Sequence, residues 1–176
     1  FVGNVMIDSL IRALPRVENR PILQNLGLEP KAYILATLHR PSNVDDPVKL
    51  AGFILALSAL AAEKTVVLPA HPRTLGVIEK IGRSGMEKVG FFSTISRLAP
   101  KCLNIIPALG YLDFLKLEQQ AAGVITDSGG VQEETSFLGV PCLTVRDNTE
   151  RPVTVRLGTN RVIGSQPEAI IDAWEK

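Results

Sequence analysis

The feature that most constrains the fold is a series of short apolar runs, each followed by a longer segment with helical spacing. Within each run the apolar residues are consecutive, a pattern typical of strands that are buried on both faces. Regular alternation of such strands with helices predicts an α/β fold with a parallel sheet and helices on both sides. The runs are YILATL (33–38), TVVLPA (65–70), LNIIPA (103–108), GVIT (123–126), PCLTV (141–145) and RVIG (161–164).

Apolar spacing and capping residues set the predicted helices. We expect them at 5–14 (ending before Pro15), 47–63 (capped by Asp45 or Asp46), 75–82, 111–121, 131–138 and 167–176. In the 111–121 helix, Leu112, Leu115 and Leu117 alternate with polar residues that include Glu118. Loops are expected at 16–32, 39–46 and 71–74, and 83–101 has only a weak pattern.

Composition excludes several classes of protein. The chain has 176 residues, which suits one domain, and its formal net charge is +1 without a dense basic cluster, so no nucleic-acid partner is expected. The longest apolar run, 51–62, is far shorter than the roughly 20 residues of a bilayer span and predicts a buried helix, not a membrane segment. Two histidines are too few for a predicted metal site.

The cysteines and the first residue give further expectations. Cys102 and Cys142 lie among apolar residues, which favours buried thiols in a reducing, cytoplasmic compartment. The sequence begins with Phe1 and without a basic leader. This suggests either a piece of a longer protein or a chain whose beginning is missing.

Polar and cationic residues follow the predicted strands. Because the carboxyl ends of parallel strands meet at one edge, where α/β folds bind ligands, we expect these residues to share one rim. A rim with both histidines and four arginines indicates an anionic ligand with several oxygens, most simply a phosphate or diphosphate. The residues are His39, Arg40, His71, Arg73, Leu109, Tyr111, Asp127, Ser128, Arg146, Thr149, Glu150 and Arg151.

The segment TDSGGVQEE, 126–134, leaves several roles open: a phosphate cradle, a metal site, an acid/base pair or an ordinary strand-to-helix turn. Small residues at 128–130 and the free N–H groups of a starting helix favour a diphosphate over a metal. We place Glu133 and Glu134 in the first turn, where acidic residues favour the helix dipole. One of them could instead accept hydrogen bonds from a ribose diol.

Each of three other rim segments can be interpreted in two ways. His39 is either a loop residue that caps a strand end or a cationic, proton-shuttling partner of phosphate or sugar oxygens. The His71–Arg73 segment is either a structural turn or a ligand contact. The Thr149–Pro152 segment is either a surface ion pair or part of the site.

The sequence contains four motifs in this order: LHRPSN, HPRT, TDSGGVQEE and RDNTERP. Together with the segment VGNVMIDSL near the start, they resemble the corresponding segments of UDP-N-acetylglucosamine 2-epimerases. The resemblance extends from about residue 2 to residue 172. It implies a GT-B architecture, with a nucleotide sugar in the cleft between two Rossmann-like domains. The whole chain, 1–176, would be the UDP-binding C-terminal domain, and the N-terminal domain would be absent.

The resemblance also implies a reaction. Family members invert C2 of UDP-GlcNAc by removing the C2 proton and expelling UDP, which then adds back to give UDP-ManNAc. The bacterial enzymes need neither NAD nor a catalytic metal. Some relatives instead hydrolyse the nucleotide sugar and release free ManNAc and UDP. Full-length members are often homodimers. A GT-B glycosyltransferase half and a stand-alone UDP-sugar binding module remain as alternatives.

Site residues follow from the resemblance motif by motif. His39 matches a histidine implicated in catalysis, and the remaining positions match substrate-binding residues. Ser128, Gly129 and Gly130 match the loop that contacts the phosphates, and Arg151 matches an arginine that contacts the diphosphate. Glu134 matches the glutamate that binds the ribose hydroxyls, and Leu109 and Phe114 match the segment on the uracil side. Arg73 matches the basic residue of the HPR loop. The carboxylates that move protons belong to the absent domain.

Two positions depart from the family pattern. Ser42 stands where the family commonly has a glutamate, which puts any role of that glutamate in ordering the loop in doubt. Val153 also stands where a glutamate is common. We interpret both as features of a family branch.

Overall fold

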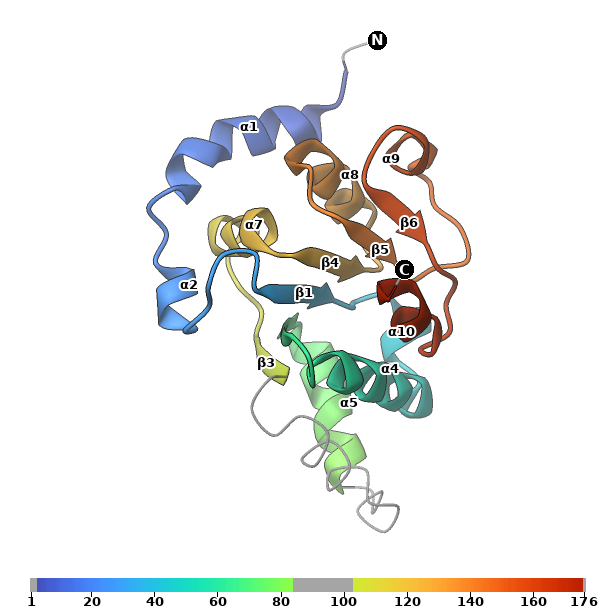
Figure 1. Ribbon diagram of the computed structural model, residues 1–176. Coiled ribbons are helices and arrows are strands. Elements are labelled where there is room, and N and C mark those ends of the chain that lie inside the picture. The colour runs from blue at the N-terminus through green and yellow to red at the C-terminus, as the bar shows by residue number, and fades with distance from the viewer. Residues whose placement is uncertain (1–2, 84–102, 176) are drawn as a thin grey trace.

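A computed structural model describes residues 3–83 and 103–175. Its centre is a six-stranded, entirely parallel sheet in the order β3-β2-β1-β4-β5-β6 (Figure 1). This order is that of a doubly wound Rossmann-like fold, so the predicted fold class is confirmed. The strands are β1 (Tyr33–Thr37), β2 (Thr65–Ala70), β3 (Leu103–Pro107), β4 (Gly123–Thr126), β5 (Cys142–Thr144) and β6 (Asn160–Val162).

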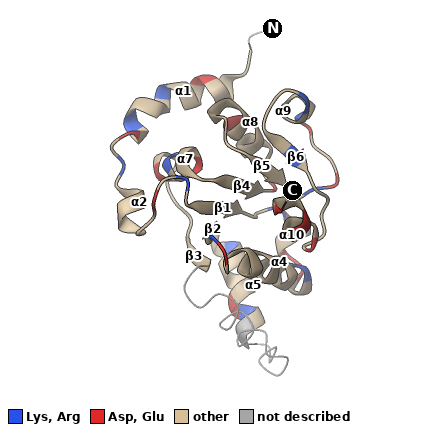
Figure 2. Ribbon diagram, viewed as in Figure 1, with Lys and Arg blue, Asp and Glu red and all other residues tan. Residues whose placement is uncertain are grey.

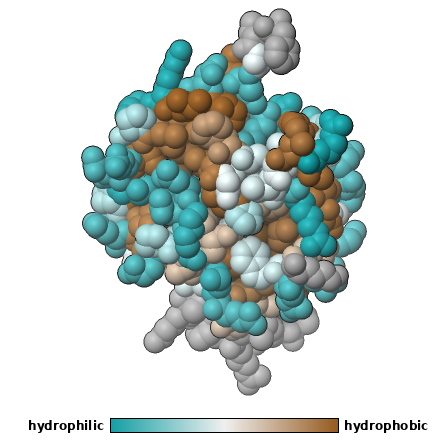
Figure 3. Space-filling model, turned by 45° about the horizontal axis from the view of Figure 1, so that its top comes forward, coloured by the Kyte–Doolittle hydropathy of each residue, from teal (hydrophilic) through white to brown (hydrophobic). Residues whose placement is uncertain are grey.

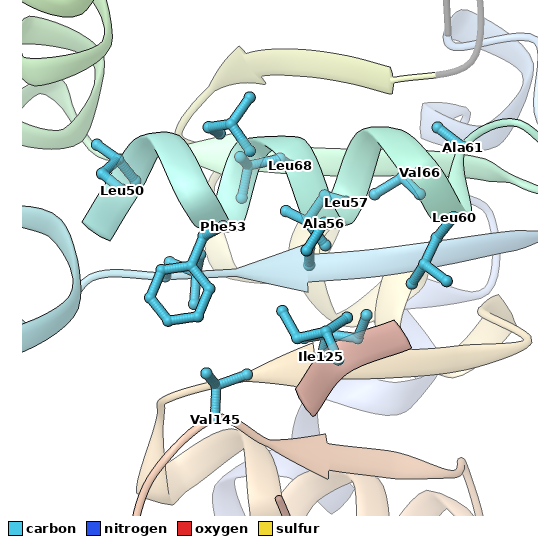
Figure 4. Packing of buried hydrophobic residues seen from close by; sticks show 14 of the residues in the cluster. Leu50, Phe53, Ala56, Leu57, Leu60, Ala61, Val66, Leu68, Ile125 and Val145 are labelled. Carbon is cyan, nitrogen blue, oxygen red and sulfur yellow. The ribbon is translucent and has the colours of Figure 1, made fainter. Parts of the chain in front are cut away.

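One face of the sheet is covered by α4 (Pro47–Leu60), α5 (Pro72–Arg83) and α10 (Ala169–Trp174). The helix α4 is apolar nearly all round, as a helix buried in a core should be. Its Phe53 and Leu57 pack against strand residues such as Leu68 and Ile125 (Figure 4). The predicted cap, Asp46, accepts a hydrogen bond from Val48 N, 2.9 Å away.

The opposite face is covered by α7 (Tyr111–Gln120), α8 (Gly129–Leu138) and the short helix α2 (Ile22–Asn25). Alternate residues of β1 divide between the faces: Ile34 belongs to the core under α4, and Tyr33 and Leu35 to the core under α7. The first helix, α1 (Val5–Val17), lies outside α7 and α8 (Figure 1). Helices on both sides explain why the strands β1 to β5 carry no charged residue (Figure 2).

Several predicted boundaries are wrong. The helix α1 continues through Pro15 to Val17, because Leu10, Ala13 and Val17 form a buried stripe whose packing offsets the hydrogen bond that proline removes. The helix α5 begins at Pro72, so the predicted 71–74 loop is mostly helical. The helix α8 begins at Gly129 and not at residue 131, and α10 spans only Ala169–Trp174.

Three short helices lie in segments that we predicted as loops or left unassigned. They are α2, α3 (Pro41–Val44) and α9 (Pro152–Arg156). Helices of four or five residues are too short to show a hydrophobic period and are not stable alone, so tertiary contacts determine them. The weakly patterned segment and Cys102 lie outside the described residues.

Some apolar side chains reach the surface of α1, α8 and α9, on the face shown in Figure 3. They include Ile11, Phe137 and Val155. Within the described ranges, no helix has the length and apolar character that a bilayer crossing requires.

Candidate functional site

The strand order places a topological switch point at the carboxyl ends of β1 and β4, and we call this region the crevice after the usual ligand position in such folds. Chain connections run outward in opposite directions from these two neighbouring strands, because β2 lies beyond β1 and β5 beyond β4. Ligands of doubly wound folds bind at such a switch point. His39 follows β1 here, and Ser128 follows β4.

The centre of this crevice is Asp127, which is fully buried. Its carboxylate accepts hydrogen bonds from the backbone N–H groups of His39 (3.1 Å) and Arg40 (3.0 Å) and from Asn43 Nδ2 (3.1 Å). Arg40 Nε donates to the Asp127 carbonyl at 2.9 Å. Asp127 therefore joins the segment after β1 to the start of α8.

His39 is oriented by the same carboxylate. Its Nδ1 lies 2.9 Å from Asp127 Oδ1, and about half of the side chain is exposed. The hydrogen bond to Asp127 raises the pKa of His39, although burial opposes the change. Because Nδ1 is held by Asp127, Nε2 remains available to a ligand as a hydrogen-bond donor when the ring is charged.

Beside His39, the helix α8 presents its N-terminus. Ser128 is the N-cap, and its Oγ accepts a hydrogen bond from Val131 N at 3.5 Å. The N–H groups of Gly129 and Gly130 are the first of the helix and have no partner four residues earlier, so they can bind an anion. A Cβ on Gly130 would lie only 2.8 Å from the terminal methyl group of Met6, so α1 closely approaches this loop.

The arginines of the rim are paired with carboxylates. Arg40 Nη2 lies 3.1 Å from Glu150, and Arg146 forms a bidentate contact with Glu150. The hydrogen bond from Arg146 is the main reason that the pKa of Glu150 is lowered to about 2. The same carboxylate lies 3.9 Å from the position that a Cβ on Gly129 would take, next to the helix N-terminus. The rim is a network of ion pairs, not a bare cluster of positive charge.

A buried polar network supports the segment that contains Arg151. Gln132 Oε1 accepts hydrogen bonds from Thr149 Oγ1 at 2.5 Å and from Asn160 Nδ2 at 3.2 Å. Asn160 also donates to Thr154 and accepts from Thr144. These contacts tie α8 to β5, β6 and α9, so Gln132 has a structural role that its position in the motif did not reveal.

The two glutamates of the motif lie in different surroundings. Both lie beyond the first turn of α8, contrary to our prediction, because the helix begins at Gly129. Glu133 accepts a hydrogen bond from Asn4 and lies 3.2 Å from Arg151 Nε. Glu134 is buried and accepts a hydrogen bond from the Tyr111 hydroxyl at 2.8 Å.

The other predicted site residues take varied positions. Leu109 and Phe114 pack together with the core under α7, at the carboxyl end of β3. Arg151 faces Glu133 rather than the Gly129 N–H group. Arg73, at the start of α5, forms an exposed ion pair with Asp45 at 2.5 Å.

Sequence reasoning missed the roles of Asp127, Asn43, Tyr111, Gln132 and Glu118. The role of Asp127 could have been predicted from the sequence, since it is a carboxylate that directly follows a fully buried strand. Glu118 was assigned to the polar side of its helix, which is wrong because the structure buries it completely. Its spacing of seven from Tyr111 and three from Leu115 places all three on one stripe of α7.

Comparison with known proteins identifies the family to which the chain belongs. A family model described as UDP-N-acetylglucosamine 2-epimerase matches residues 1–176. The chain belongs to the UDP-N-acetylglucosamine 2-epimerase family. Among the described residues, no group of three or more His, Cys, Asp or Glu side chains is arranged to hold a metal ion.

Relatives within this epimerase family differ in their named substrates. A UDP-N-acetylglucosamine 2-epimerase homolog of Methanococcus maripaludis is 41% identical over 99% of this chain and 46% of its own length. A UDP-2,3-diacetamido-2,3-dideoxy-D-glucuronate 2-epimerase of Pseudomonas aeruginosa is 40% identical over 98% of this chain and 43% of its own length.

A solved structure of the family supports the same fold. The UDP-GlcNAc 2-epimerase of Methanocaldococcus jannaschii, in complex with UDP-GlcNAc and UDP, superposes with a TM-score of 0.80 at 36% identity. The match covers 99% of this chain and 46% of the other. The chain thus spans about half the length of the relatives that it matches.

Proposed function

We propose that this chain is the UDP-binding C-terminal half of a GT-B 2-epimerase that interconverts UDP-GlcNAc and UDP-ManNAc. The observation that carries the proposal is the juxtaposition of the α8 N-terminus with His39 and Glu134 at the switch point of the sheet. The match to about half of each relative supports the assignment to one domain of two.

Each part of UDP has a counterpart in this arrangement. The diphosphate would lie at the N–H groups of Gly129 and Gly130, capped by Ser128, where the helix dipole favours negative charge. His39, when protonated, would supply a cationic donor on the opposite side. Arg151 would reach the diphosphate only by leaving Glu133, and Arg73 only by leaving Asp45.

The nucleoside would extend along α7 and α8. Glu134 lies four residues after Gly130, hence one turn further along the same helix face. A carboxylate there would accept both hydrogen bonds of a ribose diol while the diphosphate stays at the helix start. The uracil would lie beside Leu109 and Phe114, which together form an apolar surface at the start of α7.

The proposed reaction removes the C2 proton and expels UDP from C1; UDP then adds back to C1 while C2 takes a proton with the opposite stereochemistry. This chain would bind UDP through both steps, while carboxylates of the N-terminal domain would move the C2 proton. UDP is the part that the named substrates of the Methanocaldococcus and Pseudomonas relatives share. Epimerisation without release of free sugar is the proposed outcome, and the full-length protein would be a homodimer.

Titration of UDP into the 176-residue chain by calorimetry tests the proposal. Glu134→Ala should weaken UDP binding by roughly tenfold, the equivalent of about 1.4 kcal/mol for hydrogen bonds to a charged group. It should weaken 2′-deoxy-UDP much less. The control is Glu29→Ala, since Glu29 is exposed just before β1, at the opposite edge of the sheet. Equal UDP affinity of Glu134→Ala and wild type would remove the ribose role of Glu134.

A further inference from the structure

Glu118 is a completely buried carboxyl group to which the proposed binding of UDP gives no role. It lies in α7 between the apolar residues of two clusters, Leu115 and Leu117 on one side and Ala121 on the other. Among the described residues, neither of its oxygens has a hydrogen-bond donor. A buried carboxylate without donors would cost several kcal/mol, so the group needs another explanation.

The neighbour that supplies the explanation is Glu134. Glu118 lies on the stripe of α7 that also carries Tyr111, whose hydroxyl reaches Glu134 on α8, and the interaction between the two carboxyl groups acts on the pKa of each. Two carboxylates cannot form a hydrogen bond, but a carboxylic acid can donate to a carboxylate. One proton on the pair therefore removes the buried charge of Glu118, gives one of its oxygens a partner and adds a donor to Glu134.

The surroundings decide which group keeps the proton. Burial raises the pKa of Glu134 as well, but the Tyr111 hydroxyl, which donates to it at 2.8 Å, opposes this change and favours the charged form. Glu118 has no such donor, and burial together with the charge of Glu134 raises its pKa far above the ordinary value. The other ionisable groups that act on the pair are Glu133 on α8 and the thiol of Cys142 on β5, and neither supplies a positive charge.

We propose that Glu118 is a positioning residue for nucleotide binding: it stays protonated and, with Tyr111, fixes the Glu134 carboxylate for the ribose diol. This inference rests on the proposed function of Glu134. With two donors from α7, the Glu134 carboxylate is held in one orientation and keeps lone pairs for the ribose hydroxyls. Preorganisation of this kind lowers the cost of ordering the side chain when the ligand binds.

The test compares Glu118→Gln with Glu118→Met in titrations of UDP and 2′-deoxy-UDP. A glutamine amide still donates to Glu134, so Glu118→Gln should bind UDP within about twofold of wild type. Methionine has a similar size but no donor, and a lost hydrogen bond to a charged group predicts UDP binding weaker by roughly fivefold to tenfold. The loss should be smaller for 2′-deoxy-UDP, because part of the diol contact is already missing.

The pH profile is the second measurement. Wild-type affinity for UDP should fall as the pH rises through the titration of Glu118, whereas Glu118→Gln should lack this step. Tyr111→Phe removes the other donor and should reduce the preference for UDP over 2′-deoxy-UDP even if Glu118→Met fails to fold.

The outcomes are distinguishable. A wild-type chain that binds no UDP would overturn the proposed function itself. A wild type that binds UDP, together with a Glu118→Met that binds it equally well, would overturn only the role of Glu118. Equal weakening of UDP and 2′-deoxy-UDP by Glu118→Met would also overturn it, since that result indicates a general structural defect.

Discussion

Asp127 shows how one buried charge can organise a site. Burial alone would raise its pKa, but hydrogen bonds from His39, Arg40 and Asn43 outweigh burial and lower it. The carboxylate is therefore charged at neutral pH and holds donor groups of three residues in the segment after β1. Removing it would leave those donors buried without an acceptor, which costs about 1–3 kcal/mol for each unsatisfied group.

We predict that Asp127→Asn lowers the pKa of His39 toward its ordinary value, because the anionic acceptor at Nδ1 is lost. The folded-state pKa of His39 is raised, so the pair stabilises the fold fully below the unfolded value of about 6.5. That contribution is lost as the pH rises through the folded value. Asp127→Asn should remove this dependence.

NMR titration of the imidazole protons measures the effect directly. The chain has two histidines, so a His71→Gln variant assigns the signals. An unchanged pKa of His39 in Asp127→Asn would show that the carboxylate does not control the imidazole.

At this scale the sequence predicted positions better than contacts. The strand-end rule correctly placed His39, Asp127 and Ser128 at one edge of the sheet. It could not reveal that each rim arginine faces a carboxylate, because most of those partners, such as Asp45 for Arg73 and Glu133 for Arg151, come from other segments. Glu118 was wrongly assigned to the polar side of its helix, since the reason for its burial is its interaction with Glu134 on α8, which the local sequence does not show.

Among the helices, α8 has the clearest sequence signal for its C-terminus, the glycine at position 139. Gly139 has φ +69°, in the left-handed region, and its N–H bonds the Thr135 carbonyl. We predict that Gly139→Ala destabilises the fold by about 1 kcal/mol, because a Cβ is unfavourable at this φ. Gly76→Ala should instead stabilise it by about 0.5–1 kcal/mol, since Gly76 lies inside α5 with open space for a Cβ.

Urea unfolding monitored by circular dichroism compares the two alanine variants. They add the same methyl group to different backbone conformations, so each is the control for the other. Equal effects on the free energy of unfolding would contradict the role of Gly139 as a helix-terminating residue.

The strands were predictable because their signal is local. Runs such as TVVLPA are apolar throughout, and β2 has the predicted bounds, Thr65–Ala70. The end of α1 was not predictable, because the packing of Val17 against distant residues decides whether a helix continues past Pro15. Local patterns thus specified the sheet and its class, while tertiary contacts set the short helices and several helix ends.

For the whole molecule, the question is which carboxylates could move a proton. The buried or rim carboxylates at the crevice are already engaged: Asp127 by His39, Glu134 by Tyr111 and Glu150 by Arg146. A general base needs a free lone pair within reach of the substrate proton. Within the described residues, this crevice is therefore better suited to binding a nucleotide than to removing a C2 proton.

We predict that the 176-residue chain binds UDP but does not convert UDP-GlcNAc into its 2-epimer. Positioned general bases contribute roughly 10²–10⁴-fold to such rates, and the relatives extend over about twice the length matched here. Product formation is measured by NMR of the sugar anomeric protons, with a full-length family member as the positive control. Conversion by the purified chain would show that its own residues suffice for proton transfer, and would direct the search for the base to His39, Asp127, Glu134 and Glu150.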